Sequence, residues 1–281
     1  MFQSTTAIFA TGLATFLIIL AFCLRKNPFH SMVFLFRDLI QSRVMLFHLL
    51  GGMSILLLNK LELIMEPHLD PNVSDWTPYI KVFEENVTPL VQQLFKTPLL
   101  TCVTTYFYVI VFSTLMFASL FVYHHNRDYR SWYTLIYGIS INYLLAIPFF
   151  LFAPVAEAWS SHPDVQFLIP TVYPDFEEQY RHFSGLNNSF PSLHTSISVT
   201  MAIIAWQSQN RRLAGVSALS AGIVLFAILY LGIHWYLDLI AGLVLASVSV
   251  SLASRLCEIP LGTHQLELSR RKASEQMSNL S

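Results

Sequence analysis

Two short stretches of this 281-residue chain combine side chains that could catalyse a reaction. Residues 187–194 read NNSFPSLH, and residues 232–238 read GIHWYLD. In the second stretch His234 and Asp238 are four positions apart, so on a helix they share one face. The carboxylate can accept a hydrogen bond from one imidazole nitrogen, which fixes the tautomer and leaves the other nitrogen free as a nucleophile. The pair therefore indicates nucleophilic catalysis.

The first stretch could supply what phosphoryl transfer needs besides a nucleophile. The leaving oxygen must be protonated, and His194 in its protonated form suits that role. The phosphate oxygens must be surrounded by hydrogen-bond donors, because positioning and charge stabilisation dominate this reaction. The candidate donors are backbone amides at the start of the following helix, with the side chains of Ser192, Asn187, Asn188 and Arg181.

The elements that must bring these stretches together are long apolar runs. His194 and His234 are 40 residues apart. The runs 191–206 and 213–233 between them form one helical hairpin, so both histidines fall at the same end of it. Because His194 lies several residues inside its run, we expect a somewhat recessed site.

The composition indicates a membrane protein. Hydrophobic residues make up 54% of the chain and charged residues 12%, whereas soluble domains carry about 25% charged residues. A membrane-spanning helix needs about 20 mostly apolar residues. The first run is expected to be a retained helix, because Arg25 and Lys26 follow it and no basic residue precedes it. We therefore expect an all-α, polytopic transmembrane helical bundle of about seven spans. The runs are 7–24, 44–61, 99–123, 132–151, 191–206, 213–233 and 235–253.

Lysine and arginine positions predict the orientation of the bundle. Basic residues concentrate in the connections after odd-numbered runs and after the last run, whereas the two long loops hold few. We expect the N-terminus, both long loops and the active site on the extracytoplasmic or luminal side, and the C-terminus in the cytoplasm. The predicted segments are N-terminal transmembrane helices 1–61, an extracytoplasmic loop 62–98, a catalytic transmembrane core 99–254 and a cytoplasmic tail 255–281.

The first long loop contains a predicted amphipathic helix. Residues 76–95 place apolar side chains at roughly helical spacing. We expect this helix to lie on the lipid headgroups. Recruitment of a substrate is the alternative role.

At these motifs the chain resembles the type-2 phosphatidic acid phosphatase superfamily, whose membrane enzymes pair Pro-Ser-x-His with His-x-x-x-Asp. The finer resemblance is to the inositol phosphorylceramide synthase-like branch, which has Phe-Pro-Ser-Leu-His, as in 190–194, and His-x-x-x-Asp-Leu-x-Ala-Gly, as in 234–242. It covers about residues 99–253. The resemblance implies that His234 becomes phosphohistidine, that Asp238 orients it and that His194 is the general acid. It also implies a six-helix core, here preceded by an N-terminal helix, and no metal or other cofactor.

The chain departs from the superfamily pattern at two basic motifs. A lysine and an Arg-Pro pair are expected near the end of the fourth span, but residues 148–159 contain no Lys or Arg. The superfamily also has a Ser-Arg pair ahead of the nucleophile, and the corresponding residues here are Ala227 and Ile228. Both losses remove phosphate ligands, which argues against hydrolysis of phosphates on soluble headgroups. Glu157 in the first region could hold a hydroxyl-bearing headgroup or be a solvated loop acid.

The sequence predicts an integral membrane enzyme that transfers phosphoryl groups on lipid phosphates. Water as the acceptor gives a lipid phosphate phosphatase, and an alcohol such as an inositol- or sphingoid-type lipid gives a headgroup transferase. The alternatives are a metal- or ion-binding membrane protein or transporter that uses His194, His234, Asp238 and Glu157, or a catalytically silent scaffold. The net charge of −1 gives no basic field for nucleic acid, and three scattered cysteines favour neither a disulfide framework nor a zinc site.

Overall fold

The computed structural model describes residues 5–65, 75–84, 86–181 and 184–258. Parts of all four predicted segments lie outside the described residues, namely 1–4, 66–74, 85, 182–183 and 259–281. Within those ranges the chain is helical, and the one β-type contact is an isolated bridge. The helices are α1 (Thr5–Leu24), α2 (Pro28–Gln41), α3 (Arg43–Met65), α4 (Thr77–Glu84), α5 (Val87–Phe95), α6 (Pro98–Tyr106), η2 (Phe107–Val111), α7 (Phe112–His125), α8 (Tyr129–Phe152), α9 (Ala158–Ser161), η3 (Ile169–Thr171), α10 (Phe176–Tyr180), α11 (Leu193–Gln207), α12 (Arg211–Tyr230) and α13 (Tyr236–Glu258).

The long helices confirm the prediction of an all-α, multi-pass membrane bundle. Six of them in the described chain are long and apolar enough to cross a membrane: α1, α3, the continuous α6–η2–α7, α8, α12 and α13. The remaining predicted span, 191–206, forms α11, which has 15 residues and is about 22 Å long. It packs against α8, α12 and α13. Its surroundings are therefore mainly protein, and Asn142 of α8 donates a hydrogen bond to Thr200 of α11 at 3.1 Å.

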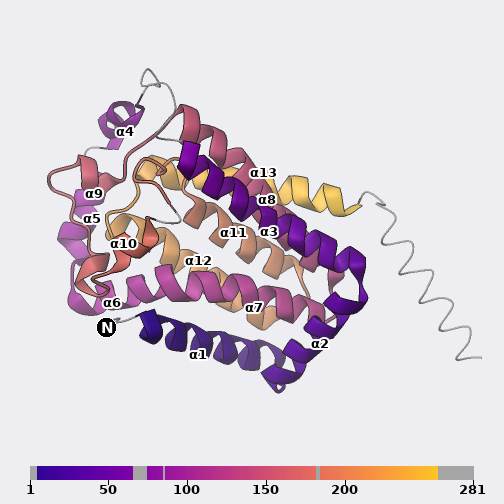
Figure 1. Cartoon of the computed structure of the whole chain (residues 1–281). Coiled ribbons are helices and arrows are strands. Elements are labelled where there is room, and N and C mark those ends of the chain that lie inside the picture. Colours follow the sequence, from indigo (N-terminus) through magenta and orange to yellow (C-terminus); the bar gives the residue numbers. More distant parts are fainter. Residues whose placement is uncertain (1–4, 66–74, 85, 182–183, 259–281) are drawn as a thin grey trace, which may run out of the picture.

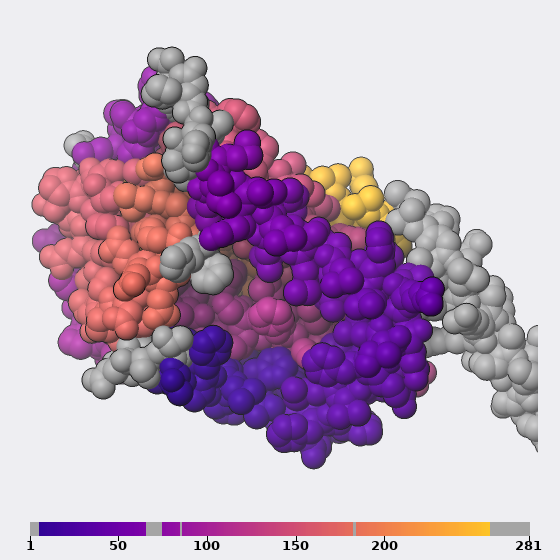
Figure 2. Space-filling model, viewed as in Figure 1, coloured from indigo at the N-terminus to yellow at the C-terminus, as the bar shows by residue number. Residues whose placement is uncertain are grey.

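The outer helices show where lipid must cover the protein. Large apolar side chains on α1 and α3 are exposed, among them Phe9, Ile18, Phe47 and Leu57. Contiguous apolar surface of this kind is rare on soluble monomers. Figure 2 shows these two helices, indigo to purple, on one side of the molecule, beside the loop between α8 and α11 in pink to orange.

Polar residues fix the helix starts at one end of the bundle. The side chain of Asn27 accepts a hydrogen bond from the backbone of Phe29 at 3.0 Å, and Pro28 occupies the first turn of α2. Asp128 and Asn210 cap α8 and α12 in the same way. Such caps satisfy backbone donors that have no partner inside the helix. The sequence predicts only a basic connection between the first two spans. The structure has a helix of 14 residues there, α2.

The predicted amphipathic helix of the first long loop is two helices, α4 and α5. Their buried side chains include Ile80, Thr88 and Gln92, and Gln92 donates to the backbone oxygens of Gln166 at 2.7 Å and Tyr230 at 2.9 Å. One face of this pair thus packs on the protein. Its position on lipid headgroups stays a prediction. Figure 1 shows α4, α5, α9 and α10 gathered at one end of the bundle, with α2 at the other.

Candidate active site

The two sequence motifs meet at the end of the bundle that carries the short helices. His234 lies in the turn between α12 and α13, and Asp238 lies in the first turn of α13. The Nδ1 atom of His234 is 3.2 Å from Oδ2 of Asp238. The contact predicted from the spacing is therefore present, although His234 itself precedes the helix. Both side chains are buried.

A left-handed glycine makes the turn before His234. Gly232 has a φ of +83°, which side chains disfavour. A Cβ atom there would also lie 2.4 Å from the backbone oxygen of Gln166. The backbone amide of His234 donates to the oxygen of Ile228 at 3.1 Å, which closes the turn against the end of α12. This turn sets the direction from which the imidazole reaches Asp238.

Ser189 completes the network, and the sequence reasoning did not identify it. Its hydroxyl donates a short hydrogen bond to Oδ2 of Asp238 and is 3.1 Å from Nδ1 of His234. The backbone amide of Trp235 donates to the same Oδ2 at 2.9 Å. Nδ1 of His234 is therefore held from two sides. A serine in a loop gave no signal by itself, apart from its place directly before Phe190 in the first motif.

Two loop segments run side by side to place Ser189. The amide of Val155 donates to the oxygen of Asn187 at 2.8 Å, and the amide of Ser189 donates to the oxygen of Val155 at 3.0 Å. The indole of Trp235 donates to the oxygen of Ala156 at 2.8 Å. The loop after α8 therefore links the segment that holds Ser189 to the turn that holds His234.

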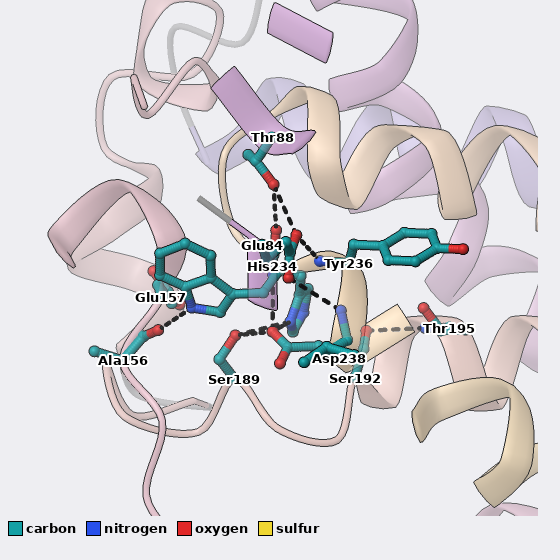
Figure 3. A network of polar contacts seen from close by, with 12 residues as sticks. Glu84, Thr88, Ala156, Glu157, Ser189, Ser192, Thr195, His234, Tyr236 and Asp238 are labelled. Carbon is teal, nitrogen blue, oxygen red and sulfur yellow. Dashed lines mark hydrogen bonds and ion pairs between the residues drawn. The ribbon is translucent and has the colours of Figure 1, made fainter. Parts of the chain in front are cut away.

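Glu84 holds the start of α13 from the opposite side (Figure 3). Its two carboxylate oxygens accept hydrogen bonds from the backbone amides of Tyr236 and Leu237, the latter at 3.1 Å. Thr88 donates to Glu84 at 3.3 Å and to the backbone oxygen of His234 at 3.5 Å. Burial is the largest influence on the Glu84 carboxyl and raises its pKa from 4.5 to about 7, although the backbone hydrogen bonds oppose that change.

His194 lies in the first turn of α11 and faces His234. Its ring stacks on Tyr108, with centroids 4.0 Å apart, and its centroid is 6.5 Å from that of His234. Tyr108 belongs to the π-helical turn η2, a type of distortion often found at functional sites. Among the described residues no hydrogen bond holds the His194 imidazole. Its ring is thus oriented by stacking, and its nitrogens stay available for substrate.

Close backbone approach positions the start of α11. A Cβ atom on Gly242 would lie 2.7 Å from Cβ of Thr195 and 2.8 Å from the backbone oxygen of Ser192. The amide of Ser192 donates to the backbone oxygen of Asp238 at 3.2 Å, and its hydroxyl accepts from the amide of Thr195 at 3.3 Å. Ser192 therefore caps α11 and fastens it to α13. The substrate contact predicted for its side chain stays a prediction.

A cavity of about 400 Å³ opens on the two histidines. Its polar lining residues include Glu157, Asn188 and Tyr180 together with His194 and His234. Its apolar lining residues include Ile8 of α1, Val109, Phe112, Phe150 and Ile197. This arrangement suits a molecule with a polar head and a lipid tail. No Lys or Arg is present among the described residues of the lining.

Two of the predicted substrate ligands bind each other. Arg181 donates to Glu157 through Nη1 at 3.0 Å and Nη2 at 2.7 Å, and Trp159 donates to the same carboxylate at 2.6 Å. Burial opposes the charge on Arg181, but the hydrogen bonds and the charge of Glu157 outweigh it and raise its pKa. The charge of Arg181 is therefore largely neutralised where a phosphate would approach.

The two predicted asparagines have different positions. Asn188 lines the cavity, and its amide donates to both carboxylate oxygens of Glu62, at 3.1 Å and 3.2 Å. Asn187 contributes its backbone oxygen to the loop pairing. Glu62 lies on α3, so an N-terminal helix reaches the site. In the described part of the chain no three His, Cys, Asp or Glu side chains converge as metal ligands would.

Comparison with known proteins agrees with this geometry. The fold is similar to the crystal structure of LpxE from Aquifex aeolicus, with a TM-score of 0.50 and 20% identity over 62% of this chain and 95% of that chain. No curated protein matches the sequence significantly. Residues 84–252 match the family model of the PAP2 superfamily, so the match includes Glu84, both motifs and the helices that carry them. The chain is an integral membrane member of the PAP2 superfamily.

Proposed function

We propose that this protein is a membrane enzyme that transfers the phosphoryl group of a lipid phosphate through a phosphohistidine at His234. The observation that carries the proposal is the double restraint on Nδ1 by Asp238 and Ser189. With Nδ1 engaged, Nε2 is the nitrogen available to attack phosphorus. The mixture of polar and apolar side chains that line the cavity suits a lipid phosphate.

The reaction proceeds in two balanced steps. Nε2 of His234 forms a bond to phosphorus while the bond from phosphorus to the lipid oxygen breaks. His194 in its protonated form gives its proton to that oxygen. Asp238 stabilises the positive charge that develops on the His234 ring. In the second step neutral His194 takes a proton from the acceptor hydroxyl, whose oxygen attacks phosphorus and releases His234.

The charge of the cavity favours a phosphodiester substrate, which is the substrate class of a headgroup transferase. A phosphomonoester carries about −1.5 to −2 charges at neutral pH, and a phosphodiester carries one. The described lining has no Lys or Arg, and Arg181 is paired with Glu157. Fewer positive charges are available than a dianion would require. This supports the inositol phosphorylceramide synthase-like headgroup transferase over the phosphatase, the second candidate.

The test uses lipids labelled on phosphorus in mixed micelles. Phosphatidate and phosphatidylinositol are each supplied with and without an alcohol acceptor such as ceramide, and wild type is compared with His234→Ala. Label released as free phosphate by wild type alone identifies a phosphatase, and label moved to the alcohol identifies a transferase. An alkaline quench followed by mass spectrometry should find phosphate on His234 with phosphatidate, and phosphoinositol on His234 with phosphatidylinositol. Turnover of either lipid by His234→Ala at the wild-type rate would contradict the mechanism.

A metal-dependent enzyme would respond differently to a chelator. The phosphohistidine reaction uses only the side chains of His234, Asp238 and His194. Turnover should therefore survive dialysis against a chelator, whereas a metal site built on the same residues should lose activity and regain it when the metal is returned.

A further inference from the structure

A second cavity lies at the opposite end of the bundle from His234. It has a volume of about 1070 Å³, opens to the surface and is lined by the turns after α1, between α7 and α8, and between α11 and α12, with Ser254 of α13. The start of α12 lines this cavity, and the other end of α12 leads to His234, so the two sites lie at opposite ends of one helix (Figure 1). Its arginines are Arg25, Arg127, Arg130, Arg211 and Arg212.

The guanidinium groups of three of these arginines have no protein partner in the described chain. Arg130 binds Glu258 at 2.7 Å, and Arg212 donates to the backbone oxygen of Phe22 at 2.7 Å. The single acid in the lining, Asp128, accepts the hydrogen bond that caps α8. The arginines whose guanidinium groups make no hydrogen bond or ion pair to a described residue are Arg25, Arg127 and Arg211. The cavity therefore has a marked excess of positive charge.

The backbone at two of these arginines is an independent observation. Arg25 has a φ of 53° and Arg127 a φ of 56°, and they are the non-glycine residues with positive φ in the described chain. They follow the ends of α1 and α7, a position at which glycine or asparagine is usual. A left-handed conformation is unfavourable for a residue with a Cβ atom. The backbone conformation favours glycine at both positions, so the presence of arginine is explained by its side chain. Both residues line the same cavity.

We propose that this cavity binds a multiply charged phosphate group. Guanidinium groups form paired hydrogen bonds to phosphate oxygens, and several converging arginines neutralise such a group. The group could belong to an anionic phospholipid of the leaflet at this end or to a soluble phosphate compound. Basic pockets between transmembrane helices at the cytoplasmic side bind phospholipid headgroups, and this end is the one predicted to face the cytoplasm. The site is separate from the catalytic cavity.

The main competing explanation is the general excess of basic residues on cytoplasmic loops. Lys26, Arg37 and Arg43 belong to the same predicted side but do not line the cavity. If a diffuse attraction between basic loops and anions were the only effect, removal of Lys26, Arg37 or Arg43 would weaken anion binding as much as removal of the cavity arginines. They therefore supply a matched control.

The experiment uses full-length protein carrying His234→Ala, so that lipid is not consumed, in phosphatidylcholine nanodiscs. The probes are phosphatidate in the nanodisc and inorganic pyrophosphate in the buffer, and the readouts are the affinity and the rise in Tm. The test variant is Arg25→Gly with Arg127→Gly, and the control is Arg37→Gln with Arg43→Gln. Glycine relaxes the positive φ, so the test variant should melt no lower than its parent without a probe.

We expect the test variant to bind the probe about tenfold more weakly or worse, and to lose most of the rise in Tm, while the control binds within about twofold of the parent. Phosphatidate bound in the catalytic cavity contributes equally to all variants. A response to phosphatidate alone identifies a lipid headgroup, and a response to pyrophosphate identifies a soluble anion. Equal losses in both variants, or no response of the parent to either probe, would overturn the proposal.

Discussion

Removal of the Ser189 hydroxyl tests whether the network around His234 works as inferred. The hydroxyl donates to Oδ2 of Asp238 and lies 3.1 Å from Nδ1 of His234. In Ser189→Ala, Oδ2 keeps the backbone amide of Trp235 at 2.9 Å and the imidazole at 3.2 Å. The variant therefore leaves the catalytic groups present but less firmly oriented, and the fold is expected to persist.

The size of the effect follows from the charge of the acceptor. A hydrogen bond to a charged group contributes about 1.5–3 kcal/mol. Each 1.4 kcal/mol corresponds to about a tenfold change in rate. The Asp238 carboxylate matters most when positive charge develops on the His234 ring, so the loss should appear mainly in kcat. We expect kcat of Ser189→Ala to fall roughly 10- to 100-fold with little change in KM.

The assay measures initial rates with the lipid on which wild type is active. Ser113→Ala is the control, because Ser113 lines the cavity while its hydroxyl donates to the backbone oxygen of Val109 in the same continuous helix. The control should keep near-normal kcat. A fall of less than about twofold in Ser189→Ala, with unchanged Tm, would refute the role assigned to Ser189.

Three further results are expected. Asp238→Asn should keep its Tm and lose turnover about 1,000- to 10,000-fold, because the imidazole tautomer is no longer fixed; near-normal turnover would remove Asp238 from the mechanism. The folded protein holds the Glu84 proton up to a pKa of about 7, above the ordinary 4.5, so the free energy of unfolding should fall as pH rises from 4.5 to 7. Denaturation of wild type and Glu84→Gln at several pH values across this window measures that fall. An equal dependence of the free energy of unfolding on pH in both proteins would contradict the raised pKa of Glu84. Gly232→Ala should be destabilised by at least about 1–2 kcal/mol from its φ alone, with a further loss from the contact with Gln166; an unchanged Tm would show that the turn can adapt.

The sequence alone determined the fold class and the centre of the site. Long apolar runs predict helices because a backbone in lipid must satisfy its hydrogen bonds within one segment. The spacing of His234 and Asp238 predicts their contact, and the contact is present although His234 lies in the turn before α13 and not on the helix itself. The hairpin between the motifs was enough to bring His194 towards His234. The number of spans depends on tertiary packing, because α11 is shorter than the helices around it and is buried among them.

Only the tertiary structure decided which other groups support the site. Ser189 reaches Asp238 across 49 residues, Asn188 reaches Glu62 across 126, and the amide of Tyr236 reaches Glu84 across 152. Nothing in the local pattern encodes such contacts, because they depend on how loops pack over the ends of the helices. The pairing of Arg181 with Glu157 is of the same kind: each residue alone was a plausible substrate ligand, and their bidentate contact leaves the cavity poor in positive charge. The arginines at the opposite end also became a site only when three separate turns folded around one cavity.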